Sequence, residues 1–303
     1  MKKVGSMTKE RWLIVGGNGA LGTDLVELLG SRAIPAFYSD FDISNKDQAF
    51  EFIKKQPITA IVNTAAYHHV PSCEEFPEEA FKVNAVGVRN LAEICSYLHL
   101  HLCHISTDYV FDGEKGSPYS EEDLPRPLNS YAVSKMAGEY MVQAYADSYS
   151  IVRSCGLYGK VPTVAKKGNF LTNILKQTQI KDELTIVNDE IVAPTYTMEL
   201  ARGIKALMEA EGKGVFHITQ GGQTTWYDFA VLFLKQLDID IPVKPVSRNQ
   251  FQSSLNRPQY SILDCSKFQA LTGADLLPWD EALCAYIEEN GAHLKESCVY
   301  TRS

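Results

Sequence analysis

Short apolar runs alternate with helical patterns through the first half of the chain. Residues 12–15 (WLIV) form a continuous apolar run, which is typical of a strand buried on both faces of a parallel sheet. Residues 58–62 (ITAIV) repeat this pattern, and a long amphipathic stretch follows over residues 74–97. The alternation predicts an α/β fold with a Rossmann-like, doubly wound parallel sheet.

The alternation is less regular after residue 160. Helical patterns and apolar runs still follow one another, with helices expected over residues 170–179, 197–210, 225–237 and 280–293, and strands over residues 184–187 and 215–219. We therefore expect a nucleotide-binding domain over residues 1–160 and a smaller α/β lobe over residues 161–303. Some segments of the second half are expected to return to the first domain.

A glycine-rich loop joins the first apolar run to the first helix. It reads GGNGALG over residues 16–22, and leucines at helical spacing follow it as far as Gly30. Glycines here would permit a tight turn, a close approach of the backbone to a pyrophosphate, and close packing of helix on sheet. The loop predicts a dinucleotide site, against the alternative of an ordinary glycine-rich turn. The residues of this loop expected to contact the cofactor are Gly16, Asn18, Gly19, Ala20 and Leu21, and Gly22 would let the helix lie close to the sheet.

The second strand should end beside the adenosine ribose, where an acid favours NAD and a base favours NADP. We place this strand near residues 35–38. Asp40 and Asp42 lie close by, but Phe37 and Tyr38 also suit the diagnostic position, so NADH and NADPH both remain open.

Two further segments complete the predicted cofactor site. Asp42 and Ile43 belong to a loop that is expected to contact adenine. After the third strand, the small residues Ala65 and Ala66 would let the cofactor phosphate and ribose pass close to the backbone. Asn84 would steady this loop, with a solvated or capping role as the alternative.

A tyrosine and a lysine four residues apart carry the candidate chemistry. Tyr131 and Lys135 would share one face of a helix. An ammonium close to a phenol favours the phenolate, so we expect the pKa of Tyr131 to fall toward the working pH. The spacing alone is common, and its alternative is a surface tyrosine beside a solvated lysine. Thr107 ends a predicted strand upstream, where its hydroxyl would hydrogen-bond a substrate, and residues 113–129 are expected to form a surface excursion.

Composition narrows the classes of partner. The 303 residues carry a net charge of -8, which argues against nucleic acid or an anionic membrane. No apolar run reaches the roughly 20 residues that cross a bilayer, and the first residues lack the apolar segment of a signal peptide. Seven cysteines without a C-x-x-C pair predict reduced thiols in a cytoplasmic protein.

Two smaller features have competing interpretations. His99, His101 and Cys103 would share one strand face, but with no fourth ligand nearby we expect satisfied histidines and no metal. The basic stretch at residues 164–169 (VAKKGN) is either a solvated loop or a contact to a diphosphate.

Together these motifs resemble the dTDP-4-dehydrorhamnose reductase family of extended short-chain dehydrogenases/reductases. The resemblance covers nearly the whole chain. Its motifs are residues 16–22, 106–113 (STDYVFDG), 131–135 (YAVSK), 188–195 (NDEIVAPT), 225–226 (TW) and 257–264 (RPQYSILD). The last of these is the more specific marker of the family.

The resemblance implies a reaction. Such an enzyme uses NADPH or NADH to reduce the C4 keto group of a nucleotide-linked 4-keto-6-deoxy sugar, typically dTDP-4-dehydrorhamnose to dTDP-rhamnose. Thr107, Tyr131 and Lys135 would be the catalytic residues, with Tyr131 as proton donor and Lys135 on the nicotinamide ribose. The lobe of residues 161–303 would bind the nucleotide sugar.

The resemblance also implies a substrate site. Its members would be Thr107, Asp108, Tyr109, Val110, Trp226 and Arg257. Core packing is the alternative role for Trp226, and a structural ion pair is the alternative for Arg257. Related dehydratases carry Glu where this chain has Tyr109, which argues against dehydration. Many family members have Trp where this chain has Gly156, so a stacking surface for the sugar is missing there.

Two other functions share parts of this pattern. One is a regulatory nucleotide-binding subunit similar to the β subunit of methionine adenosyltransferase, and the other is a nucleotide-sugar epimerase. Some relatives are homodimers with Mg²⁺ between the subunits, for which Asp24 or Glu199 would be the ligands here.

Overall fold

Six parallel strands form the main sheet of the protein. In the computed structural model, which describes residues 10–161, 168–250 and 255–299, their spatial order is β2-β1-β3-β4-β5-β8. The strands are β1 (Trp12–Val15), β2 (Ala33–Ala36), β3 (Ala60–Asn63), β4 (His101–Thr107), β5 (Tyr149–Ser154) and β8 (Gly214–His217). Because the chain leaves β1 toward opposite edges, a crevice is expected at the carboxyl ends of β1 and β3. The predicted doubly wound α/β fold is confirmed.

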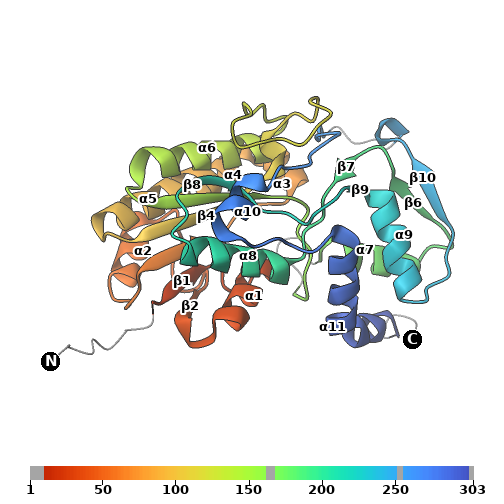
Figure 1. Cartoon of the computed structure of the whole chain (residues 1–303), viewed down its shortest axis with the longest axis horizontal. Coiled ribbons are helices and arrows are strands. Elements are labelled where there is room, and N and C mark those ends of the chain that lie inside the picture. Colours follow the sequence, from red (N-terminus) through yellow and green to blue (C-terminus); the bar gives the residue numbers. More distant parts are fainter. Residues whose placement is uncertain (1–9, 162–167, 251–254, 300–303) are drawn as a thin grey trace.

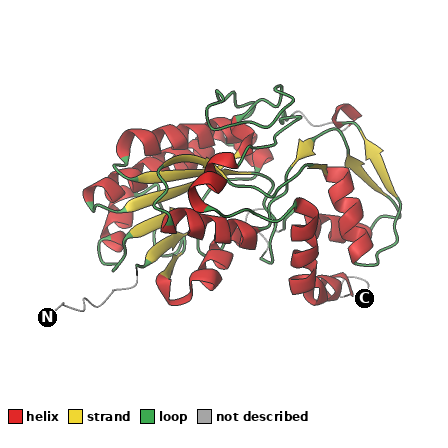
Figure 2. Cartoon of the chain, viewed as in Figure 1, coloured by secondary structure: helices red, strands yellow, loops and turns green. Residues whose placement is uncertain are grey.

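Helices cover both faces of this sheet (Figures 1 and 2). One layer holds α1 (Ala20–Leu29), α8 (Thr197–Glu209) and α10 (Ser266–Thr272), and the other holds α2 (Lys46–Ile53), α5 (Val88–Tyr97) and α6 (Ser130–Tyr145). Alternate residues of β1 serve the two layers: Trp12 and Ile14 pack against the first, and Leu13 and Val15 against the second. This two-sided burial explains why the strand reads as one apolar run.

A smaller α/β region lies beside the sheet and has its own core (Figure 1). Its elements are α7 (Phe170–Thr178), β6 (Leu184–Val187), β7 (Ile191–Val192), β9 (Thr224–Thr225), α9 (Trp226–Gln236), β10 (Val243–Val246) and α11 (Trp279–Val299). Strand β6 pairs in parallel with β10, and β7 pairs antiparallel with β9. The short strands β7, β9 and β10 were not predicted, because two to four residues carry too little pattern to stand out.

The helix predicted over residues 74–97 is broken in the structure. Its segments are α3 (Val70–Glu75), α4 (Pro77–Phe81), a π-helical turn (Lys82–Gly87) and α5. The π turn places Asn84 inside the protein, where its amide accepts from Tyr67 N at 2.8 Å and donates to Ser134 Oγ at 2.9 Å. Asn84 therefore ties the loop after β3 to α6, as one of its two expected roles required.

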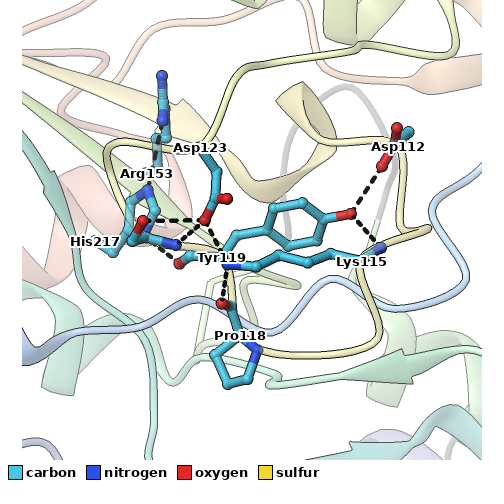
Figure 3. A network of polar contacts seen from close by, with 8 residues as sticks. Asp112, Lys115, Pro118, Tyr119, Asp123, Arg153 and His217 are labelled. Atoms are coloured by element: carbon cyan, nitrogen blue, oxygen red, sulfur yellow. Dashed lines mark hydrogen bonds and ion pairs between the residues drawn. The ribbon is translucent and has the colours of Figure 1, made fainter.

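The predicted surface excursion is anchored more firmly than expected. Tyr119 is buried, and its hydroxyl donates to Asp112 Oδ1 at 2.7 Å. His217 of β8 lies beside Tyr119, with Nδ1 3.0 Å from Tyr119 O, and Lys115 Nζ donates to Asp123 Oδ2 at 2.6 Å (Figure 3). On its other side Tyr119 bonds the backbone of Ile262 and Asp264. The excursion thereby holds the 257–264 segment against the sheet.

Three other predictions concern metal ions and the membrane. His99 lies in a turn with a φ of 53°, before β4 begins at His101, so His99, His101 and Cys103 do not share a strand face. Within the described residues there is no group of three His, Cys, Asp or Glu side chains that would hold a metal. Asp24 instead bonds Thr197, and Glu199 pairs with Arg202, so neither supports the Mg²⁺ hypothesis here. None of the described helices is long and apolar enough to cross a membrane.

Candidate active site

The glycine loop forms a cradle at the carboxyl end of β1. Gly16 has a φ of +80°, and a Cβ there would lie 2.8 Å from Thr64 Oγ1. A Cβ on Gly22 would lie 2.2 Å from Gly16 O, so α1 packs against the loop more closely than any other residue allows. Gly19 is the N-cap of α1 and provides no side-chain cap, which leaves backbone N–H groups for a phosphate. The loop therefore fits a dinucleotide pyrophosphate.

Gly22→Ala tests this cradle. Alanine normally stabilises a helix relative to glycine, but the contact with Gly16 O should force the loop and α1 apart at a cost of about 1–3 kcal/mol. We expect the Kd for NADPH, measured by fluorescence titration, to rise roughly tenfold or more. Gly291→Ala, where the nearest atom is 3.6 Å away, is the matched control and should leave Kd unchanged. Equal Kd values for the two variants would contradict binding of the cofactor by this cradle.

The adenosine side of the crevice differs from expectation at β2. This strand ends at Ala36 rather than near residue 38, so Phe37 follows it directly. Asp40 accepts from Phe37 N at 2.8 Å and Asp42 accepts from Ser44 N at 2.8 Å. Both carboxylates thus stabilise turns, and the residue that directly follows the strand, Phe37, is neither an acid nor a base. Asp42, Ile43, Ala65 and Ala66 line the same cavity as the glycine loop, as do Asn18, Gly19, Ala20 and Leu21.

The three candidate catalytic residues lie around this cavity, which has a volume of 1710 Å³. Asn129 caps α6 by accepting from Ala132 N at 2.9 Å, and this helix carries both Tyr131 and Lys135. Thr107 ends β4, and its hydroxyl donates to Asp108 Oδ1 at 3.1 Å. Lys135 is fully buried and donates to Ile105 O at 2.6 Å. The structure therefore brings Thr107 to the same cavity as Tyr131 and Lys135, although they belong to separate sequence motifs.

The expected lowering of the tyrosine pKa is wrong for the protein described here. Burial raises the pKa of Tyr131, and a hydrogen bond with Thr107 opposes only part of that effect. Burial also lowers the pKa of Lys135 to about 8, with Glu139 acting in the opposite direction. A phenol with a raised pKa stays protonated at working pH, so Tyr131 carries the proton that a donor needs, but the raised pKa also makes it a weaker acid.

Tyr109, Trp226 and Arg257, which are expected to bind the substrate, also line the cavity. Tyr109 meets Tyr131 edge to face at a centroid distance of 6.1 Å. Burial raises the pKa of Asp108 to about 6, and hydrogen bonds with Ser261, Cys155 and Thr107 oppose this. The Val110 prediction is wrong as far as its side chain is concerned. That side chain is fully buried against Phe111 and Tyr119 and does not line the cavity.

The segment that carries Arg257 is attached to α6, the helix of Tyr131 and Lys135. The Asn129 amide, which caps α6, also donates to Asn256 O at 2.8 Å, next to Arg257 in sequence. Arg257 Nε is buried and has no hydrogen-bond partner among the described residues. A buried donor without a partner is costly, and a phosphate oxygen would satisfy it. No salt bridge of Arg257 is found among the described residues, although its charge opposes the rise that burial causes in the pKa of Glu190.

The sequence did not predict five polar residues of the smaller α/β region that face the cavity. They come from α7, the turn after α7, the loop after β6 and the turn after β10: Asn173, Gln177, Lys181, Glu190 and Arg248. Their only sequence signal is the i, i+4 spacing of Asn173 and Gln177 on one helix face. The basic stretch at residues 164–167 lies outside the described residues.

Trp226 occupies the space that the missing aromatic residue would need. Gly156 has a φ of +48°, and a Cβ there would lie 2.9 Å from Cη2 of Trp226. Trp226 is only partly buried, contacts Phe170 at a centroid distance of 4.7 Å, and lines the cavity. The cavity thus keeps an aromatic wall beside Gly156, supplied by α9.

The fold and the site together define an NAD(P)-dependent oxidoreductase of the short-chain dehydrogenase/reductase type. The chain belongs to the RmlD substrate binding domain family, whose model matches residues 10–291.

Two relatives of known name are similar over most of their length. The dTDP-4-keto-6-deoxy-D-glucose reductase of Streptomyces niveus is 34% identical, covering 90% of this chain and 95% of that protein. The dTDP-4-dehydrorhamnose reductase of Aggregatibacter actinomycetemcomitans is 32% identical, covering 90% and 97% respectively.

Solved structures agree with this assignment. A dTDP-4-dehydrorhamnose reductase from Clostridium acetobutylicum superposes with a TM-score of 0.88 at 35% identity, covering 93% of this chain and 99% of that one. The Bacillus anthracis enzyme, solved in complex with NADP, has the same TM-score and coverage at 32% identity. The Thermus thermophilus UDP-glucose 4-epimerase, at 19% identity and a TM-score of 0.77, shares the fold alone.

Proposed function

We propose that this protein uses NADPH or NADH to reduce the C4 keto group of a dTDP-linked 4-keto-6-deoxy sugar. Among such sugars we propose dTDP-4-dehydrorhamnose, which gives dTDP-rhamnose. The observation that carries the proposal is the single cavity that joins the glycine cradle, the Tyr131–Lys135 pair and Arg257. A cofactor at one end and a nucleotide sugar at the other would meet beside Tyr131.

Each catalytic residue then has a defined task. The bound nicotinamide supplies hydride to C4. Tyr131, kept protonated by its burial, donates its phenolic proton to the C4 oxygen, so that the ketone becomes an alcohol and the tyrosine a phenolate. Thr107 lies at the end of β4, where its hydroxyl would turn from Asp108 to the C4 oxygen and orient the carbonyl by donating to it. Lys135 binds the cofactor ribose and returns a proton to the phenolate.

The pattern of charged residues supports a diphosphate beyond the sugar. Arg257, Arg248 and Lys181 line the cavity together with the acid Glu190, in a protein whose net charge is -8. A local group of cations in an acidic protein indicates an anionic ligand at that place. Trp226 supplies an aromatic surface near the sugar.

Arg257→Gln tests the phosphate contact. Loss of a charge-assisted hydrogen bond costs about 1.5–3 kcal/mol, so KM for the nucleotide sugar should rise roughly 10- to 100-fold. Because the phosphate takes no part in the bond changes, kcat should change little. Arg126→Gln, at an exposed arginine paired with Asp112, is the control and should leave KM unchanged. A fall in kcat without a change in KM would contradict this role.

Product analysis tests the proposed reaction. Purified protein is mixed with NADPH and, separately, with dTDP-4-dehydrorhamnose or dTDP-4-keto-6-deoxy-D-glucose, and the sugar products are identified by NMR. We expect oxidation of the cofactor with the first sugar and formation of dTDP-rhamnose. Turnover of the second sugar alone would support reduction at C4 but reject rhamnose as the product. Oxidation with neither sugar would reject the function. Parallel assays with NADH measure whether the protein prefers NADH or NADPH, which Phe37 does not indicate.

A further inference from the structure

His104 lies beside the catalytic lysine, and the mechanism above does not use it. It belongs to β4 and is fully buried. Its Nε2 lies 3.4 Å from Lys135 Nζ, the same nitrogen that donates to Ile105 O. The only partners found for the His104 ring in the described part of the chain are Lys135 and Asn63.

Asn63 determines which ring nitrogen of His104 carries the proton. Asn63 ends β3 as the direct neighbour of His104 across the sheet, and it is fully buried. Its Oδ1 accepts from Ala65 N at 3.2 Å, so its amide nitrogen is the atom that faces His104 Nδ1, also at 3.2 Å. An amide nitrogen only donates, and Nδ1 must therefore be the unprotonated acceptor.

The proton of a neutral His104 ring is consequently on Nε2 and directed at Lys135. Burial, followed by the charge of Lys135, lowers the pKa of His104 well below its usual value, so the ring stays neutral. An ammonium has three N–H donors and no acceptor, whereas a neutral amine has a lone pair. The His104 N–H therefore opposes the charged form of Lys135 and stabilises the neutral form.

Other charged groups near Lys135 do not remove this effect. Glu139 lies one turn further along α6 and favours the ammonium. Its carboxylate is however bonded by Arg153 Nη2 at 2.7 Å and by Ser106, so much of its charge is already compensated. Tyr131 on α6, Asp108 and Tyr109 after β4, and Cys155 after β5 are further titratable groups that line the cavity.

We propose that His104, with its tautomer fixed by Asn63, is a positioning residue that stabilises the neutral Lys135 formed when the lysine returns a proton to Tyr131. In that step a Lys135 N–H bond breaks, the phenolic O–H bond of Tyr131 reforms, and the new amine lone pair accepts the His104 Nε2–H. Solvent then reprotonates Lys135. This inference rests on the proposed role of Tyr131 as proton donor.

Nitrogen NMR of the protein labelled with ¹⁵N-histidine tests the tautomer without any need for turnover. His104 is assigned by comparison with His104→Gln. We expect its neutral Nε2–H tautomer from pH 6 to pH 9, with a shift of the Nε2 signal near pH 8 as Lys135 titrates and no such shift in Lys135→Met. An Nδ1–H tautomer would overturn the inference. Because this readout is independent of activity, it stands even if no keto sugar is reduced.

Asn63→Asp tests the consequence for catalysis. A carboxylate at residue 63 would accept from Nδ1–H, turn the Nε2 lone pair toward Lys135 and favour the ammonium. The alkaline decline of kcat, which marks loss of the lysine proton, should move up by about one pH unit. His101→Gln is the control, since His101 lies on the same strand but bonds Ser148 and Ser150. An unmoved decline in Asn63→Asp, or an equal movement in both variants, would reject the role of His104.

Discussion

Tyr131→Phe is expected to lower kcat for keto-sugar reduction by about 10²–10⁴-fold, the contribution typical of a positioned general acid. The substitution removes one oxygen and keeps the ring, so the edge-to-face contact with Tyr109 should persist. The cradle lies on other elements, and the Kd for NADPH should therefore stay within about twofold of the native value. Stopped-flow measurement of NADPH oxidation under single-turnover conditions reports the chemical step.

Tyr140→Phe is the matched control for this substitution. Tyr140 lies on the same helix, but it is 57% exposed and does not line the cavity. Its kcat should be native. If Tyr131→Phe kept more than about one tenth of the native kcat, another group would have to supply the proton, and Tyr131 would not be the proton donor.

Glu139→Gln is expected to destabilise the protein by about 3–5 kcal/mol, because it leaves Arg153 buried without its counter-charge. Both side chains are almost inaccessible, and Arg153 bonds both carboxylate oxygens of Glu139. Arg153 also lies over Phe111. It is next to His217, which contacts Tyr119 of the excursion (Figure 3). The loss should appear as a lower urea midpoint without a change in the slope of the transition.

A double variant separates charge from packing. In Glu139→Gln with Arg153→Met, no charge remains buried at this site, so much of the lost stability should return. Arg89→Gln removes an exposed pair with Glu93 and should change stability by less than about 1 kcal/mol. If the double variant were as unstable as the single one, the cost would come from packing and hydrogen bonds rather than from an unpaired charge.

Local patterns were sufficient to predict the sheet and the cradle. A buried parallel strand needs an apolar run, and a loop that contacts a pyrophosphate needs glycines. Both features can be recognised from residues that are adjacent in the sequence. The position of Thr107 at a strand end followed from the same reasoning. Tyr131 and Lys135 needed only helical spacing.

Properties that depend on distant residues could not be predicted in this way. The pKa of Tyr131 rises because several elements cover it, and no spacing along α6 contains that information. Trp226 lies over Gly156 although 70 residues separate them in the sequence. The π turn at Asn84 follows from its bonds to Tyr67 and Ser134, which replace regular helical geometry. His104 is one of two histidines in β4, and its pairing with Asn63 depends on the neighbouring strand β3 rather than on nearby sequence.

Deuterium transfer tests the central claim most directly. The protein is incubated with dTDP-4-dehydrorhamnose and NADPH that carries deuterium at the transferable position of the nicotinamide, and the product is examined by NMR. The account predicts a dTDP-linked 6-deoxy sugar with deuterium at C4, formed by the native protein and by Tyr140→Phe but not by Tyr131→Phe. Deuterium at any other carbon, or consumption of the cofactor without label in the sugar, would contradict it.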